Sequence, residues 1–448
     1  MVQTKKRIFT EIIFVMLMLL SLGACSTTKD GDVHDTKPDI ETEVPKEKEE
    51  VEKEVISVLE IKESDFYTSP TSFQNEKNFR TDFNADLTFD TDDSGNLQAA
   101  IDAISLSGGG KLTIPQGNYT FSGINMKSNV HLEIDENAVI RPPLKGSDQR
   151  NYYLFSFGRE TAAVKNVSIT SSANKFKIDL TQVDNINVTV FSLKNVDGFL
   201  LSGFVVDDVL TDFSSIAFGI TEYNGTYYWP RNGVVKNATT NNADYGYGLI
   251  QAQAATNVFF KDLSGTGGVT LRFETGEKNM NNLQKGGVRD MYAENISCTN
   301  GNAALMISPH AMHNGKVYAN GITSVSCGFG IRIGGGYVAK KYDQDIGLTS
   351  GDYEEVTLLN IKATYGQNKA QLKSKHYKYM PCNLRDLVET TPINTLEEDA
   401  KSFWGPSIAG VIDTSNFPVN LIREDVNAIG FQDGFEVVDD SEIIENCN

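Results

Sequence analysis

Cysteine is scarce in this sequence of 448 residues, which contains five. Apart from Cys25, the chain has Cys298, Cys327, Cys382 and Cys447. These four are too few and too scattered for a small disulfide-held scaffold, and they lack the short spacings of a zinc site. We therefore expect no metal or other cofactor in the chemistry, while a structural calcium or chloride ion stays open.

Positive charge is also in deficit, because 40 Lys and Arg residues stand against 59 Asp and Glu residues, for a net charge of −19 at pH 7. Such an acidic chain is not expected to bind nucleic acid. A local group of arginines can outweigh the net charge, so an anionic substrate remains compatible with this composition.

The N-terminus has the layout of a cleaved secretion signal. Three basic residues precede an apolar run over residues 8–22, and the sequence Leu-Gly-Ala-Cys follows and ends at Cys25. This run is too short for a lasting membrane span, and its ending is the lipobox of bacterial lipoproteins. We expect residues 1–24 to be removed and Cys25 to carry the lipid. Because Ser26 follows in place of Asp, we expect an outer-membrane anchor and a cell-surface or extracellular body.

Aromatic residues are absent from the next segment, residues 25–64. Between residues 26 and 64, thirteen acidic residues accompany six basic ones. A segment of this composition cannot bury enough apolar surface to become ordered. We expect it to be a disordered, acidic linker that joins the lipid to a single body over residues 65–448.

Helical periodicity is almost missing from that body. The exception is residues 94–104, where Leu97, Ala100, Ile101 and Ile104 have helical spacing and three glycines follow. Short strands are then predicted over residues 111–114, 124–126, 130–134 and 138–140. A helix followed by such a series of strands is how a parallel β-helix covers its N-terminal end and begins to coil.

Further along the chain, short strands led by Val or Ile recur, mostly behind Asn or Gly. They begin near Asn166, Asn195, Gly233, Asn257, Gly287, Lys316 and Glu355. The irregular spacing indicates the coils of one solenoid with insertions of different length. The fold class is therefore predicted to be all-β, a right-handed parallel β-helix with an N-terminal capping helix and inserted loops near its C-terminal end. Residues 337–404 are the predicted insertion, which we expect to lie over a cleft.

Two of the cysteines provide an internal check on this repeat. Cys298 lies ten residues after Val288, and Cys327 lies ten residues after Val317, so we expect them at equivalent positions on consecutive coils. Coils stack about 4.8 Å apart, which a disulfide tolerates. Either a disulfide or a ladder of two buried thiols fits this spacing.

A charged pair stands out in the strand-like sequence VTLRFETGEK at 269–278. Arg272 and Glu274 lie two residues apart and should share one face of a strand. If neighbouring coils present Gln251, His310 and Arg332 on their outer faces, these residues form one polar stripe. Arginine forks bind sulfate or carboxylate, and a partly desolvated Glu can donate a proton to a glycosidic oxygen. The alternatives are a solvent-facing ion pair and a structural histidine. Tyr247 could line a sugar subsite.

On these residues the chain resembles the iota-carrageenases of glycoside hydrolase family 82, best between Tyr245 and Gly336. The resemblance implies an inverting endo-hydrolase that cuts the β-1,4 linkage of a sulfated red-algal galactan. It also implies individual roles: Glu274 as general acid, Gln251 as holder of water or an anion, His310 as a site-lining residue, and Arg272, Arg332 and Arg385 as sulfate binders. The expected partner is thus an anionic sulfated polysaccharide, bound by a monomer.

The chain departs from the family at Gly276, where the family has its catalytic Asp. Glu277 could replace that base if Gly276 introduces a bulge that turns the side chain to the same face. Asp244, or a water held by Gln251 and His310, are the other candidates for the base. A surface glycan-binding protein that cuts weakly or not at all is the non-enzyme alternative.

A pectin-type hydrolase is a further alternative on the same fold. That family uses Asn-Thr-Asp, Asp-Asp and Gly-His-Gly, whereas this chain has Glu-Thr-Gly and Ser-Pro-His. The sequence therefore favours the sulfated galactan over pectin.

Overall fold

A computed structural model describes residues 56–393 and 401–444, together with Cys447. The body lies within one compact unit that ends at Asn448. Cys25 and most of the predicted linker lie outside the described residues. In the part of the chain that is described, no helix has both the length and the apolarity of a membrane span.

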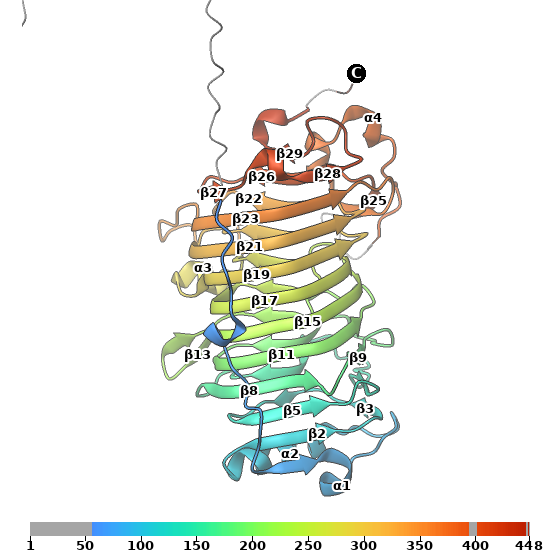
Figure 1. Ribbon diagram of the computed structural model, residues 1–448, viewed down its shortest axis with the longest axis vertical. Coiled ribbons are helices and arrows are strands. Elements are labelled where there is room, and N and C mark those ends of the chain that lie inside the picture. Colours follow the sequence, from blue (N-terminus) through green and yellow to red (C-terminus); the bar gives the residue numbers. More distant parts are fainter. Residues whose placement is uncertain (1–55, 394–400, 445–446, 448) are drawn as a thin grey trace, which may run out of the picture. The chain divides into compact units, whose positions relative to one another are not determined.

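The body is a parallel β-helix built from two long sheets, which Figure 1 shows as a ladder of stacked strands. Along the larger sheet the strands run in the order β1 (Glu76–Asn78), β2 (Gly110–Ile114), β5 (Val130–Ile134), β8 (Val164–Ser171), β11 (Val196–Asp207), β15 (Arg231–Ala243), β17 (Ala254–Gly267), β19 (Gly287–Thr299), β21 (His313–Val325), β23 (Asp352–Thr364) and β27 (Val419–Asn420). Four short strands extend it: β3 (Asn118–Thr120), β6 (Val139–Arg141), β9 (Phe176–Asp179) and β28 (Asn427–Ile429). The predicted fold class is confirmed, and the seven predicted strand starts fall on β8, β11, β15, β17, β19, β21 and β23.

The smaller sheet carries the candidate site. Its order is β4 (Ile124–Asn125), β7 (Tyr152–Phe157), β10 (Val188–Leu193), β12 (Ile216–Phe218), β16 (Ile250–Ala252), β18 (Val269–Glu274), β20 (Ala303–Ser308), β22 (Phe329–Gly334), β26 (Ala409–Thr414) and β29 (Val437–Val438). Every pair in this sheet is parallel, so each coil adds one strand in register with the previous one.

The core lies between the two sheets and contains stacked apolar side chains from successive coils. Phe155 stacks on Phe191 with ring centroids 5.5 Å apart, and Phe260 meets Phe273 at 5.6 Å. Asn257 takes a positive φ of 55° at the start of its repeat, which explains why asparagine marks these turns. Because the core lies between the two sheets, side chains that point outward from the two sheets face opposite sides of the solenoid.

A helix closes the N-terminal end as predicted. Helix α2 (Ser94–Leu106) buries Leu97, Ala100, Ile101 and Ile104, the four residues that predicted it. A short helix, α1 (Phe79–Phe83), lies beside it.

Residues 56–64 correct the predicted linker, because they are packed along the larger sheet (Figure 1). Ile61 joins an apolar cluster on this sheet, the Leu59 amide donates to the Tyr318 hydroxyl at 3.0 Å, and Glu63 pairs with Lys236 at 2.5 Å. A 3-10 turn, η1 (Glu63–Asp65), follows. The prediction was made from the acidic composition and gave no weight to the few apolar residues in this segment. These residues pack the segment on the larger sheet, opposite the smaller one.

The predicted insertion over 337–404 is also corrected, because β23 within it is a regular coil strand. The excursions are residues 335–351 and the segment from 365 to 408. The second contains β24 (Ala370–Leu372), which pairs with β25 (Phe403–Gly405), and the helices η2 (Ser374–Tyr379) and α4 (Cys382–Arg385). A disulfide that the sequence did not predict joins Cys382 to Cys447.

The expected equivalence of Cys298 and Cys327 is wrong by three residues, since Cys298 pairs with Ser324 in the register of β19 and β21. Cys327 lies beyond the end of β21, and its Sγ still approaches that of Cys298 to 2.9 Å. Both thiols are free and buried. Of the two alternatives, the structure has the thiol ladder.

Candidate active site

One column of the smaller sheet carries the predicted polar stripe. Gln251 on β16 pairs with Arg272 on β18, which pairs with Met306 on β20, which pairs with Arg332 on β22. Since neighbouring strands lie about 4.8 Å apart, these side chains lie in one row across the sheet, each close to the next. Glu274 lies two residues after Arg272 and shares its face.

Arg272 and Glu274 form a nearly buried ion pair. Their side chains are 9% and 17% exposed, and the Arg272 Nη2 donates to the Glu274 Oε2. Among the described residues, the Nε and Nη1 of Arg272 have no hydrogen-bond partner. The Tyr247 ring lies 5.9 Å from the guanidinium carbon and forms a wall beside it.

His310 completes the contacts of Glu274. It follows β20 with a positive φ of 52°, and its Nε2 lies 3.3 Å from the Glu274 Oε1. The Tyr342 hydroxyl donates to the Gly276 carbonyl at 3.2 Å and lies 2.8 Å from the His310 Nδ1. A hydroxyl has one proton, so Nδ1 donates to Tyr342 and Nε2 faces Glu274. The Tyr337 ring packs against the imidazole at 4.6 Å.

The charges around Glu274 determine its ionisation. Burial raises the pKa of Glu274, but the positive charge of Arg272, the contact with His310 and the charge of Arg332 together hold that pKa well below its usual range. The expectation that desolvation keeps this carboxyl protonated is therefore wrong for the unliganded site, because the ion pair outweighs burial.

Gly276 does not occupy a strand position, since β18 ends at Glu274 and the Thr275 hydroxyl donates to the Pro309 carbonyl at 2.7 Å. The chain then enters helix α3 (Lys278–Leu283). A Cβ atom at Gly276 would lie 2.7 Å from the His310 Nε2. The imidazole thus fills the space that a side chain at position 276 would enter.

Glu277 is the N-cap of α3. Its Oε1 accepts from the Asn279 amide at 3.0 Å and its Oε2 from the Met280 amide at 2.5 Å. The turn at Gly276, rather than a bulge within the strand, directs this carboxylate toward the cavity.

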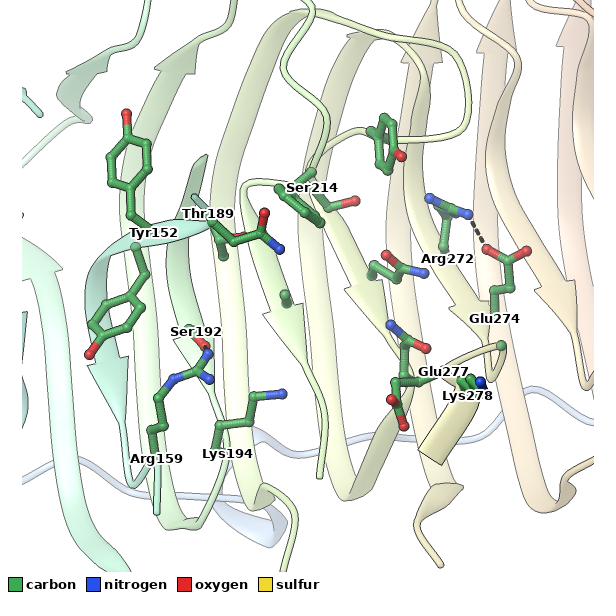
Figure 2. Close-up of a pocket in the computed structure, with 18 of the residues that line it drawn as sticks. Tyr152, Arg159, Thr189, Ser192, Lys194, Ser214, Arg272, Glu274, Glu277 and Lys278 are labelled. Atoms are coloured by element: carbon green, nitrogen blue, oxygen red, sulfur yellow. Dashed lines mark hydrogen bonds and ion pairs between the residues drawn. The ribbon is translucent and has the colours of Figure 1, made fainter. Parts of the chain in front are cut away.

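A cavity of about 680 Å³ lies over this face (Figure 2). Its described lining contains two carboxylates, Glu274 and Glu277, and five cationic side chains: Arg159, Lys194, Arg272, Lys278 and Lys341. Gln251, Tyr247 and His310 also line it. Figure 2 shows Arg159 and Lys194 toward one end and Arg272 with Glu274 toward the other. The cavity is thus locally positive in a protein of strongly negative net charge.

Three predicted residues do not line this cavity in the described structure. Asp244 is buried and accepts from the Tyr245 amide at 2.7 Å. Arg332 is half-buried and donates to the Tyr245 hydroxyl at 3.2 Å and to the Asn302 Oδ1 at 2.5 Å.

Arg385 differs most from its predicted role. It lies in α4 and donates to the Met380 carbonyl at 3.3 Å and the Ile444 carbonyl at 2.6 Å. These bonds tie the C-terminal segment to the solenoid, so the sulfate-binding assignment of Arg385 is not supported by its position.

Sequence reasoning missed several residues that reach the site from loops. Arg159 and Lys341 approach from segments without strand periodicity, and Tyr337 and Tyr342 come from residues 335–351. Lys194 follows β10, and burial lowers its pKa to about 8. Only their basic or aromatic character within the coil connections could have indicated them.

A second cavity of about 1060 Å³ shares Arg159, Lys194 and Glu277 with the first. The hairpin of β13 (Thr221–Tyr223) and β14 (Thr226–Tyr228) forms its other wall. The two cavities therefore adjoin each other along these shared residues. Within the described chain, no group of three or more His, Cys, Asp or Glu side chains could hold a metal ion.

Comparison with known proteins gives one consistent result. No protein-family model matches the sequence. The chain is 34% identical over 415 residues to an iota-carrageenase of Alteromonas macleodii, covering 80% of this chain and 84% of that protein. It is 32% identical over 468 residues to an iota-carrageenase of Zobellia galactanivorans, covering 92% and 91%.

Solved structures agree with these sequence matches. A 1,3-α-1,4-β-D-galactose-4-sulfate-3,6-anhydro-D-galactose-2-sulfate 4 galactohydrolase has a TM-score of 0.80 and 33% identity, with 88% of this chain and 97% of that chain covered. An iota-carrageenase complexed with iota-carrageenan fragments has a TM-score of 0.80, 31% identity and the same coverage.

Proposed function

We propose, because this chain belongs to the iota-carrageenase family, that it is an endo-acting glycoside hydrolase that cleaves the β-1,4 linkages of iota-carrageenan with inversion. Both relatives are named iota-carrageenase, and a similar solved structure holds iota-carrageenan fragments. The galactohydrolase of the same fold is named for a 1,4-β linkage between sulfated sugars.

The observation that carries this proposal is the positive cavity around a buried Arg–Glu pair. The cavity concentrates five cations beside two carboxylates, although the protein as a whole has a net charge of −19. A polymer with regularly spaced sulfates would be attracted to such a region by its local field. Pectin, which carries carboxylates, would use the cations in the same way, but the matches in sequence favour the sulfated galactan.

In the proposed reaction, Glu274 donates a proton to the glycosidic oxygen and Glu277 accepts one from the attacking water. Glu277 is the second carboxylate among the described lining residues, whereas Asp244 is not among them. An inverting pair needs a separation of about 6.5 to 9.5 Å so that water fits between the carboxyl groups. The N-cap bonds of Glu277 fix its orientation and leave each oxygen one further acceptor site.

The test is to incubate the full-length protein with iota-carrageenan and to follow the product sizes. Endo-hydrolysis shortens the polymer early and accumulates small even-numbered oligosaccharides late. Glu274→Gln and Glu277→Gln should each lower turnover by a factor of about 10² to 10⁴, since each removes one proton-transfer group. Asp244→Asn is the matched control and should keep wild-type turnover.

Two outcomes would redirect the proposal. Polymer binding without any shortening would leave a surface glycan-binding protein, which lacks the usual base at Gly276. Full activity in Glu277→Gln combined with loss in Asp244→Asn would make Asp244 the base.

We also propose that the enzyme works as a monomer at the outer membrane, attached through a lipid on Cys25. The N-terminal signal layout supports this proposal. A Cys25→Ser variant should move the protein from the membrane fraction to the soluble fraction. An unchanged membrane fraction would contradict the lipid anchor.

A further inference from the structure

The ion pair at the centre of the site poses a chemical problem. A general acid must carry a proton, yet Glu274 accepts a hydrogen bond from the Arg272 Nη2 and is held in its ionised form. The site therefore needs an event that puts a proton on Glu274 before the bond is cleaved.

The geometry of Arg272 suggests what that event is. Its side chain is more than nine-tenths buried, it lines the cavity, and two of its nitrogens, Nε and Nη1, have no partner among the described residues. Unpaired N–H groups of a buried cation cost free energy until an acceptor arrives. A planar guanidinium binds an oxyanion through one of two pairs of nitrogens, either Nε with Nη2 or Nη1 with Nη2. Both pairs include Nη2. Since Nε and Nη1 are themselves buried, the guanidinium must turn toward the cavity to grip a sulfate with two nitrogens, and this movement draws Nη2 away from Glu274.

We propose that a sulfate group of the polymer displaces Glu274 from Arg272 and thereby causes this carboxylate to take up the proton that it later donates. The inference rests on the proposed function and adds a coupling to it, because the sulfate would be required for protonation as well as for binding. An unsulfated galactan would fit the cleft and leave its acid ionised.

The proton balance of this step is simple. Sulfate binding breaks the Nη2–Oε2 contact, one proton enters from solvent and binds a Glu274 oxygen, and cleavage passes that proton to the leaving sugar oxygen. Because His310 donates through Nδ1 to Tyr342, its Nε2, 3.3 Å from the Glu274 Oε1, is the nitrogen that can accept the incoming solvent proton and pass it to Glu274. Glu274 is then ionised again at the end of the cycle.

Other charges also act on Glu274 and must be separated from this effect. The charged groups that interact with it are Arg272 on β18, Arg332 on β22 and Lys375 in η2, and the titratable His310 follows β20. Four tyrosines also interact with it: Tyr245, Tyr337, Tyr342 and Tyr353. Burial lowers the pKa of Lys375 to about 8, so this lysine and Lys194 already carry their protons at pH 6. A nearby charge typically moves the pKa of a carboxyl by about 1 to 3.

A pH-stat experiment at pH 6 tests the coupling directly. Unbuffered full-length protein is mixed with excess iota-carrageenan oligosaccharides, and the acid needed to hold the pH counts the protons taken up. Hydrolysis of a glycosidic bond releases no net proton, so the reading reports binding even while cutting proceeds. Wild type should take up more protons than Glu274→Gln, because only wild type has the carboxyl whose pKa rises when the guanidinium is drawn away.

Arg272→Gln is the second variant. It should take up no more protons than Glu274→Gln, because without the guanidinium Glu274 is no longer held ionised before the sulfate binds. If this variant does not fold, the difference between wild type and Glu274→Gln still decides the matter. Chemically desulfated oligosaccharides should give no excess in any protein.

Equal proton uptake by wild type and Glu274→Gln would overturn the coupling. If wild type then still shortens iota-carrageenan, the proposed function stands and only the coupling fails. If the polymer is never shortened, the proposed function fails, and an excess uptake would then describe a sulfate-binding site without turnover.

Discussion

Placing a carboxylate at position 276, where the family has its base, should harm this protein. In Gly276→Asp, the added Cβ would lie 2.7 Å from the His310 Nε2 and 2.9 Å from its Cε1. The imidazole cannot easily retreat, because Tyr342 holds its Nδ1 at 2.8 Å and the Tyr337 ring packs on it at 4.6 Å. Overpacking of this kind costs about 1 to 3 kcal/mol.

We therefore expect the free energy of unfolding, measured in urea, to fall by that amount and kcat/KM on iota-carrageenan to fall at least tenfold. Gly95→Asp is a suitable control, since a Cβ there meets nothing within 4 Å. In a His310→Gly background the ring is gone and the positive φ of 52° suits glycine, so Gly276→Asp should cost little stability there. The double-mutant cycle should give a coupling of about 1 to 3 kcal/mol. A Gly276→Asp protein as stable as wild type and faster in turnover would refute this reasoning.

Three further predictions concern stability. Arg385→Ala should lose about 1.5 to 3 kcal/mol of unfolding free energy in urea and keep its KM, because its guanidinium bonds two backbone carbonyls away from the cavity. Replacing Cys382 and Cys447 by Ser should cost about 4 kcal/mol, since the disulfide closes a loop of 65 residues. Burial lowers the pKa of His131 to about 4, and the unfolded chain binds its proton near pH 6.5. As the pH falls from 6.5 to 4, wild type should therefore lose about 3 kcal/mol more of its unfolding free energy than His131→Gln loses.

The sequence predicted the larger sheet better than the smaller one. Each strand of the larger sheet from β8 to β23 begins at or near a turn residue, and Asn257 illustrates why, since its backbone has a positive φ. Strands such as β12 and β16 have three residues each, which is too short for an alternating pattern to predict them.

The candidate site was predictable where it depended on strand geometry. Two-residue spacing placed Arg272 beside Glu274, and the repeat placed Gln251 in the adjoining strand. The lack of space for a side chain at Gly276 was not predictable, because the imidazole of His310, which comes from a separate coil, fills that space. The predicted role of Arg385 was wrong for a related reason, since the irregular chain before it offers no strand register from which its position could be inferred.

The most direct test of the account is the anomeric configuration of the first products. Proton NMR of wild-type protein during the first minutes with iota-carrageenan reports the new reducing ends before they mutarotate. Inversion at a β-1,4 linkage by Glu274 and Glu277 predicts that the α-anomer appears first, and Glu274→Gln should show no signal on that time scale. Initial appearance of the β-anomer, or unchanged product formation by Glu274→Gln, would contradict the account.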